Sequence, residues 1–327
     1  MDVDTGIDDA IAIMIALQSP EIEIVGITTV SGNVTSEAAG LNTLGILRAL
    51  GKESKIPVLQ GSSRPLSKQI VRAKDVHGEK GLGNMMLESN PSLLQKGKVS
   101  HFISRILSNY RKDEVSLIAT GPLTNIARVI LEDPGNIDPL SRIYIMGGAY
   151  GLASKIYGNI SQFAEFNFYC DPKAAQTVLE YPLDKAVRLN VVGLDVTDKY
   201  LIIDGKFDSR LSDPQCMKRK KNAVGYNNKV PIIAKSLLEY PLAKFGKFNL
   251  PDIFAVAMLE RPDLFKFKRG KINIVQNGLL WGHSTFVEEN SSNNFEKGQQ
   301  IFVASKMIDK KRFHKYVFSR LCDARGL

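Results

Sequence analysis

Four aspartates within the first nine residues constrain this chain more than any other feature of its sequence. They are Asp2, Asp4, Asp8 and Asp9, with Gly6 between the two pairs, and an apolar helical pattern follows at once. Carboxylates this close raise one another's pKa and disfavour ionisation. A helix start relieves this, because its free backbone N–H groups favour negative charge, and so does a hard divalent cation with several carboxylate ligands. We therefore expect a strand end, a tight turn at Gly6, a helix start and a metal ion above the turn.

Two other interpretations of the same residues need to be weighed. Helix capping alone requires a single Asp, and stability gives no reason to gather four. An Asp-x-Asp pair at a strand end also begins haloacid-dehalogenase-type phosphatases. Those enzymes carry a hydroxyl-bearing residue two positions after the second Asp, where this chain has Gly6, and they do not use a pair such as Asp8 and Asp9. A phosphatase remains an alternative, and dependence on Mg²⁺ with a phosphate-ester substrate would identify it.

Length and composition are those of a water-soluble globular protein. The chain has 327 residues, of which 44% are hydrophobic and 24% charged. No apolar run approaches the roughly 20 residues that span a membrane, and Met1 leads directly into the acidic motif without a signal peptide. The three cysteines, Cys170, Cys216 and Cys322, are odd in number and far apart. They argue against a disulfide framework and predict a cytoplasmic protein.

The net charge of +9 raises the question of a nucleic-acid partner. One basic run, residues 218–221, stands out, but it has no interleaved aromatic residues and no recognisable binding motif. Runs of like charge usually form solvated loops. We expect neither nucleic acid nor a membrane as a partner.

Strands and helices alternate through the first two thirds of the chain, which predicts a parallel sheet with right-handed crossovers. Buried strands are expected at residues 21–30, 56–59, 115–119, 143–146 and 187–192, and helices at 35–50, 99–110, 124–131 and 172–179. Each strand ends in a polar or Gly-rich turn. Because parallel strands present their carboxyl ends at one edge of a sheet, residues distant in sequence should meet there.

The pattern loosens after the strand at 187–192. Helices are expected at 231–239 and 253–259, short strands at 272–275, 286–287 and 301–303, and a closing helix at 307–321. The predicted fold class is α/β, with a mostly parallel central sheet, helices on both faces, a small antiparallel edge and a helical cap near the active site. We expect one domain over 1–327, with about 198–250 as a variable cap segment within it.

The first strand is short for a buried central strand. Only Met1 and Val3 provide apolar side chains before Asp4. We expect Met1 to lie inside the strand, and the natural strand to begin before it.

Three motifs together resemble the inosine-uridine nucleoside hydrolase family. They are residues 2–10, residues 120–125 (Thr-Gly-Pro-Leu-Thr-Asn), and residues 164–167 (Ala-Glu-Phe-Asn) followed by Asp171 and Pro172. The resemblance extends over nearly the whole chain and thins between about 198 and 250. It implies an α/β enzyme that binds Ca²⁺ and cleaves the N-glycosidic bond of ribonucleosides, giving ribose and a free purine or pyrimidine base. It also implies a homodimer or homotetramer.

The resemblance assigns roles to particular positions. Ca²⁺ ligands would be the carboxylates of Asp4, Asp9 and Asp252 and the backbone carbonyl of Thr120, a mixed oxygen set that suits this ion. Asp4 would also deprotonate the attacking water. The positions expected to contact the ribose are Asp8, Asn33, Asn159, Glu165 and Asn167, and His77 lies in a Gly-rich loop expected near the base.

The reaction implied is hydrolysis through an oxocarbenium-like state, which the acidic groups around the sugar would stabilise. One departure from the family pattern bears on it. Many members carry His immediately before the late metal-binding Asp, where this chain has Pro251. Activation of the leaving base would then come from Tyr226, Tyr240, His77 or an aromatic stack. A relative that binds nucleosides without hydrolysing them is a further alternative, and the base preference stays open.

Overall fold

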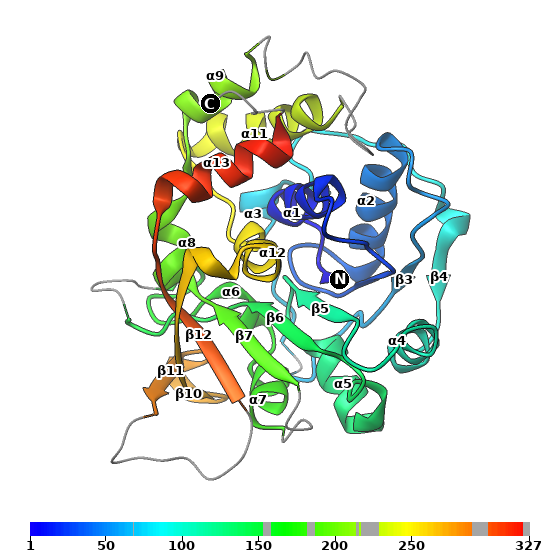
Figure 1. Ribbon diagram of the computed structural model, residues 1–327, viewed down its shortest axis with the longest axis vertical. Coiled ribbons are helices and arrows are strands. Elements are labelled where there is room, and N and C mark those ends of the chain that lie inside the picture. Colours follow the sequence, from blue (N-terminus) through cyan, green and yellow to red (C-terminus); the bar gives the residue numbers. More distant parts are fainter. Residues whose placement is uncertain are drawn as a thin grey trace.

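The computed structural model describes residues 1–67, 69–152, 158–181, 187–213, 216, 229–289 and 300–322. Its centre is a ten-stranded sheet with the order β11-β10-β12-β7-β6-β5-β1-β2-β3-β4 (Figure 1). The strands are β1 (Asp2–Val3), β2 (Ile27–Thr29), β3 (Val58–Gln60), β4 (Leu94–Lys96), β5 (Ser116–Ala119), β6 (Arg142–Met146), β7 (Arg188–Val192), β10 (Phe265–Ile274), β11 (Ser284–Glu288) and β12 (Gln300–Met307).

All neighbours from β12 to β4 pair in parallel, and β10 pairs antiparallel with both β12 and β11. The predicted parallel sheet with a small antiparallel edge is therefore confirmed.

The short strand β1 occupies the middle of the sheet, between β2 and β5. Asp2 pairs with Thr28 on one side and with Ala119 on the other. Met1 continues the hydrogen bonding: its amino group donates to the Gly26 carbonyl at 2.8 Å, and its own carbonyl accepts from the Thr28 N–H at 2.8 Å. From β1 the chain builds outward to β4 and then returns to the other side of β1 as β5. Ligands in open α/β sheets bind where the strand order reverses in this way.

Helices cover both faces of the sheet, as the sequence predicts (Figure 1). The helices fall into two groups, and each group contributes to its own hydrophobic cluster. The first contains α1 (Ile7–Gln18), α2 (Ser36–Ala49), α11 (Val230–Phe245), α12 (Asp252–Glu260) and α13 (Lys310–Leu321), and the second contains α4 (Val99–Leu107), α5 (Thr124–Glu132) and α7 (Pro172–Glu180). In the described part of the chain, none of the helices has the length and apolar character needed to cross a bilayer.

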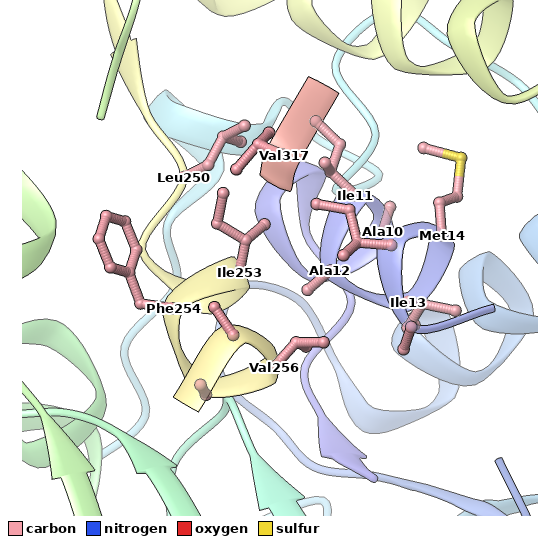
Figure 2. Close-up of a cluster of buried hydrophobic side chains, with 14 of the residues drawn as sticks. Ala10, Ile11, Ala12, Ile13, Met14, Leu250, Ile253, Phe254, Val256 and Val317 are labelled. Atoms are coloured by element: carbon pink, nitrogen blue, oxygen red, sulfur yellow. The ribbon is translucent and has the colours of Figure 1, made fainter. Parts of the chain in front are cut away.

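Helices α1 and α12 are apolar around most of their circumference, which is the pattern of a fully buried helix. Residues 7–16 of α1 are all buried, and so are residues 252–258 of α12. Figure 2 shows their side chains in one cluster, with Ile11, Ile253 and Phe254 among them and Val317 of α13 beside them. This packing holds the two helices together, and both begin at the carboxyl-end edge of the sheet. The start of each helix carries aspartate.

The segment predicted as a cap contains α8 (Leu194–Tyr200), β8 (Ile202–Ile203), α9 (Gly205–Leu211), α11 and β9 (Phe248–Asn249), with β8 and β9 paired antiparallel. Helix α11 is longer than the expected 231–239, because it continues through Pro241 and stops at Gly246, which adopts the left-handed conformation (φ 71°) typical of helix ends. The basic run 218–221 and Tyr226 lie outside the described residues.

The expectation of no disulfide was wrong. Cys216 and Cys322 form one, with a Cα–Cα distance of 4.7 Å across a sequence separation of 106 residues, while Cys170 is free and buried. Spacing along the chain carries no information about this pair. The pair forms because α9 packs against α13, where Phe207 and Arg210 contact the Phe318 ring, and only the fold brings these helices together.

The segment between β3 and α4 contains helix α3 (Lys74–His77) and strand β4. Two local predictions also differ from the structure. Strand β2 is limited to Ile27–Thr29 instead of 21–30, because β1 contains two residues and offers the preceding segment no partner. Met307 ends β12 and does not belong to the closing helix, which begins at Lys310.

Candidate active site

A cavity of about 450 Å³ lies above the carboxyl ends of the central strands. Nearly all of the predicted site residues line it: Asp8, Asn33, His77, Thr120, Asn159, Glu165, Asn167 and Asp252. Asp4 and Asp9 are completely buried beneath it. The structure thus brings together residues from both ends of the chain.

Asp4 follows β1 and is held by the turn after β2. The Asn33 N–H donates to Asp4 Oδ2 at 2.6 Å, and Asp4 Oδ1 has no hydrogen-bond partner among the described residues. Burial, and then the charge of Asp9, raises the pKa of Asp4 well above its ordinary value. One oxygen is therefore fixed by backbone, and the other is left for a ligand or a water molecule.

Asp9 is the most heavily hydrogen-bonded acid of the opening motif. Its Oδ2 accepts from the Gly6 N–H at 3.0 Å and from Asn33 Nδ2 at 3.2 Å, and its Oδ1 accepts from Thr120 Oγ1 at 2.7 Å. Even so, burial and the neighbouring charge of Asp8 raise its pKa to about 6. The side chain is locked in one orientation at the start of α1.

Three carboxylates converge next to this pair. Asp8, Asp9 and Asp252 each offer one oxygen, and the three atoms all lie within 4.8 Å of one another. All three residues are buried, and Asp8 Oδ1 has no hydrogen-bond partner among the described residues. Burial, together with the charges of Asp8 and Asp9, raises the pKa of Asp252 well above its ordinary value. Buried acids this close need a cation or shared protons, so this cluster can hold a metal ion.

Asp8 was predicted to contact the ribose. Its carboxylate lines the cavity and also belongs to the three-carboxylate cluster. Thr120, predicted to bind through its carbonyl, directs that oxygen into the site, where it accepts from Asn167 Nδ2 at 2.6 Å.

Glu165 is the N-cap of helix α6 (Phe166–Cys170). Its carboxylate accepts from the Gly148 N–H at 2.9 Å and from the N–H groups of Asn167 and Phe168, at 2.7 and 3.1 Å. Burial outweighs these hydrogen bonds and raises its pKa to about 7. Asn159 is exposed at the cavity wall and accepts from the Phe166 N–H at 2.8 Å. Two loops therefore present amide and carboxylate groups to the cavity.

His77, the last residue of α3, is buried against the start of α1. The Ile7 N–H donates to His77 Nδ1 at 3.1 Å, so Nδ1 carries no proton and the ring is neutral with its proton on Nε2. Burial lowers its pKa to about 4. The ring meets Phe248 edge-on, with centroids 6.2 Å apart. His77 thus presents a hydrogen-bond donor, and its environment keeps it uncharged at neutral pH.

Sequence reasoning missed several residues that line the same cavity. They are contributed by the loop before α3, by the end of α8 and by the segment around β9: Arg72, Asp198, Phe245, Phe248 and Asn249. Asn249 Nδ2 donates to the Asp198 carboxylate at 2.9 Å. No local pattern marks these residues, and all of them except Arg72 come from the segment where the family resemblance is thin. The Pro251 backbone and ring also line the cavity, whereas Tyr240 packs against Gly83 and does not line it.

Substitution of Gly32 tests how tightly the turn after β2 packs against the Asp4 carboxylate. A Cβ at Gly32 would overlap Asp4 Oδ2, so Gly32→Ala must displace that carboxylate or the turn that holds it. Misplacement of a catalytic group by about 1 Å costs roughly 10²-fold in rate. We expect Gly32→Ala to lower kcat by about that factor with little change in the circular dichroism spectrum. Gly205→Ala is the matched control, because a Cβ at Gly205 meets nothing within 4 Å. Equal kcat values for the two variants would contradict the proposed packing around Asp4.

Comparison with known proteins identifies the family of the chain. Residues 1–315 match the family described as inosine-uridine preferring nucleoside hydrolase. Uridine nucleosidase 1 of Arabidopsis thaliana is 32% identical over 98% of this chain and 92% of its own length. The pyrimidine-specific ribonucleoside hydrolase RihA of Escherichia coli O1:K1 is 35% identical over 88% of this chain and 87% of its own.

Solved structures give the same result. A plant nucleoside hydrolase superposes with a TM-score of 0.83 at 26% identity, covering 98% of this chain and 97% of the other. A purine-preferring ribonucleoside hydrolase from Gardnerella vaginalis has a TM-score of 0.81 at 26% identity, with coverage of 98% and 96%. The buried acidic cluster, the α/β fold and these full-length matches together show that the chain belongs to the inosine-uridine nucleoside hydrolase family and is an enzyme of that type.

Proposed function

We propose that this protein is a calcium-dependent nucleoside N-ribohydrolase, which uses water to split a ribonucleoside into ribose and a free base. The observation that carries the proposal is the placement of the Asp8–Asp9–Asp252 cluster, with Asp4 beside it, at the foot of a cavity whose walls present amides and carboxylates. A sugar with several hydroxyl groups requires such a ring of donors and acceptors. A substrate that lacks one of these hydroxyls would leave buried polar groups unpaired.

The residues that would hold Ca²⁺ are Asp8, Asp9, Asp252 and Asp4, with the Thr120 carbonyl. Their fit is supported by the oxygen-only donor set and by two buried carboxylate oxygens without partners, Asp4 Oδ1 and Asp8 Oδ1. When bound, the ion supplies positive charge that lowers the pKa of water and offsets the repulsion among these acids.

Asp4 is the proposed general base. Its Oδ2 is held by the Asn33 N–H, which leaves Oδ1 to take a proton from the attacking water. The carboxylate comes from the end of a central strand and is packed beneath Gly32, so it cannot swing away from the substrate. A positioned base of this kind contributes about 10²–10⁴-fold to the rate.

Glu165, Asn159 and Asn167 are proposed to bind the ribose. The three backbone N–H groups that donate to Glu165 fix its orientation, and Asn167 is held by the carbonyl oxygens of Thr120 and Met146. A fixed carboxylate next to the ring stabilises the positive charge that develops as the N-glycosidic bond breaks.

Uridine is the proposed preferred substrate, because relatives named for uridine and pyrimidine nucleosides match nearly the whole chain. The aromatic side chains at the base end of the cavity, Phe166, Phe245 and Phe248, offer surfaces for stacking a planar base. The test is release of free base from uridine, cytidine, inosine and adenosine, with added Ca²⁺ and after chelation. Turnover that is lost on chelation supports the proposal. No turnover from a folded, calcium-loaded sample would favour the nucleoside-binding alternative that Pro251 suggests.

We also propose that the protein is cytoplasmic, that it folds as one domain and that it assembles as a homodimer or homotetramer. In a reducing compartment, Cys216 and Cys322 would be present as thiols even though the fold places them within bonding distance. Thiol titration of protein isolated under anaerobic conditions measures whether Cys216 and Cys322 are reduced. Sedimentation of the same sample measures the number of subunits.

A further inference from the structure

The departing base needs a proton, and the position that many family members fill with His is Pro251. We propose that Asp198 is the catalytic residue that protonates the leaving base, and that Asn249 is the positioning residue that orients Asp198. This inference rests on the proposed nucleoside hydrolase function and assigns the acid for that reaction.

Asp198 lines the cavity next to the segment that contains Pro251. It lies near the end of α8, half-buried, and lines the cavity together with Asn249 of β9 and Pro251. Asn249 Nδ2 donates to Asp198 Oδ1 at 2.9 Å, and the structure assigns no partner to Asp198 Oδ2 among the described residues. One carboxyl oxygen is thus anchored, and the other is available to a ligand.

Other cavity groups suit this role less well. His77 accepts from the Ile7 N–H and has a pKa lowered to about 4, so at neutral pH it can donate a hydrogen bond but carries no surplus proton. Asp8 and Asp252 belong to the cation cluster. Asp75 is exposed at the cavity rim and forms an ion pair with Lys244 at 3.7 Å.

The electrostatic surroundings help Asp198 to keep its proton. Burial raises its pKa, the hydrogen bond from Asn249 lowers it, and the charge of Asp195 on the same helix raises it again. The charged groups that face it are Asp195 and, across the cavity, Glu165, whose own pKa is raised in part by Asp198. Two cationic side chains, Arg72 and Lys247, line the same cavity.

The proton balance of the step is complete. As the bond between the anomeric carbon and the base nitrogen breaks, its electron pair leaves with the base, and the Asp198 proton moves to a nitrogen or oxygen of the base ring. The hydrogen bond from the Asn249 side-chain amide, Nδ2, then stabilises the resulting carboxylate. Asp4 takes the proton of the attacking water and then releases it to solvent, and solvent returns one proton to Asp198. The net reaction is nucleoside plus water to ribose plus base.

The decisive experiment compares two substrates. Uridine needs its leaving group protonated, whereas p-nitrophenyl β-D-ribofuranoside releases a stable anion that does not. We expect Asp198→Asn to lower kcat for uridine by about 10²-fold or more and to leave the p-nitrophenyl substrate unchanged. The fall of kcat/KM for uridine as the pH rises and Asp198 loses its proton should also disappear in the variant.

Controls separate this role from a structural one. Asp75→Asn changes an exposed carboxylate at the cavity rim and should leave both substrates unaffected. Asn249→Ala should shift the same substrate ratio by a smaller factor, and it provides the test if Asp198→Asn does not fold. Equal losses on both substrates, or no loss on either, would overturn the assignment. If the parent enzyme hydrolyses neither substrate, the proposed function itself fails, and that outcome is distinct from the first two.

Discussion

Asp4→Asn should abolish nearly all turnover while the protein remains folded. The substitution keeps the shape of the side chain and an oxygen that can still accept from the Asn33 N–H. It removes the basic oxygen that is proposed to take the proton of the attacking water. Loss of a positioned general base costs about 10²–10⁴-fold in rate, and reduced affinity for the cation would add to it. We expect kcat for uridine to fall by at least about 10³-fold, measured at saturating Ca²⁺.

Asp2→Asn is the matched control for this prediction, since it makes the same chemical change two residues earlier on the same strand. Asp2 Oδ1 accepts from Thr28 Oγ1 at 2.6 Å and from Asn125 Nδ2 at 2.7 Å, and Asp2 does not line the cavity. We expect Asp2→Asn to change thermal stability with little effect on kcat. If Asp4→Asn hydrolyses nucleosides at the parent rate, Asp4 is not the base.

Removal of the cation is the second change with a large expected effect. After chelation, turnover should disappear and the melting temperature should fall, and both should recover when Ca²⁺ is restored. A ligand present at 100 times its Kd stabilises the folded state by about 2.7 kcal/mol. Titration calorimetry with Ca²⁺ and with Mg²⁺, together with thermal melts, measures the affinity, the selectivity and the stabilisation.

The stabilisation by Ca²⁺ should be larger at pH 8 than at pH 5. Burial raises the pKa of Asp8 to about 6 in the metal-free fold, from an ordinary value of 3.8, and burial together with the charge of Asp8 does the same for Asp9. Groups with a raised pKa in the folded state stabilise it fully only below their unfolded pKa, and this contribution is lost as the pH rises through the folded value. The metal-free protein should therefore lose stability between about pH 4 and pH 6, and bound Ca²⁺ should remove that loss.

Asp252→Asn offers a further control for the cation. It removes one charge from the cluster, from a helix start far away in the sequence. The variant should bind Ca²⁺ more weakly and show a smaller gain in melting temperature at pH 8. Undiminished turnover of the parent enzyme after complete chelation would refute the role given to the ion.

Much of the site was predictable because its signals are local. The aspartates at 2–9 lie within one strand-turn-helix unit, so their spacing alone predicts that they gather at a turn. Strand and helix alternation indicates the parallel sheet, and a parallel sheet places Asn33 and Thr120 at one edge whatever the details of packing. The role of Asp252 came from family resemblance. Its physical cause is the packing of α12 against α1, which no local pattern encodes.

The sequence by itself determined the class of fold, the acidic centre and the edge of the sheet at which they meet, since these depend on periodicity and on turns within short segments. Only the tertiary structure decided which distant residues pair. It placed Asp198 beside Asn249 and brought Cys216 to Cys322. It also brought Asp252 to Asp8 and Asp9 in the three-carboxylate cluster. The hydrogen bond from the Ile7 N–H determined which nitrogen of His77 carries the proton. Contacts between distant segments arise from the way helices and strands pack together, and the free energy of that packing is shared over many side chains, so no short pattern reveals them.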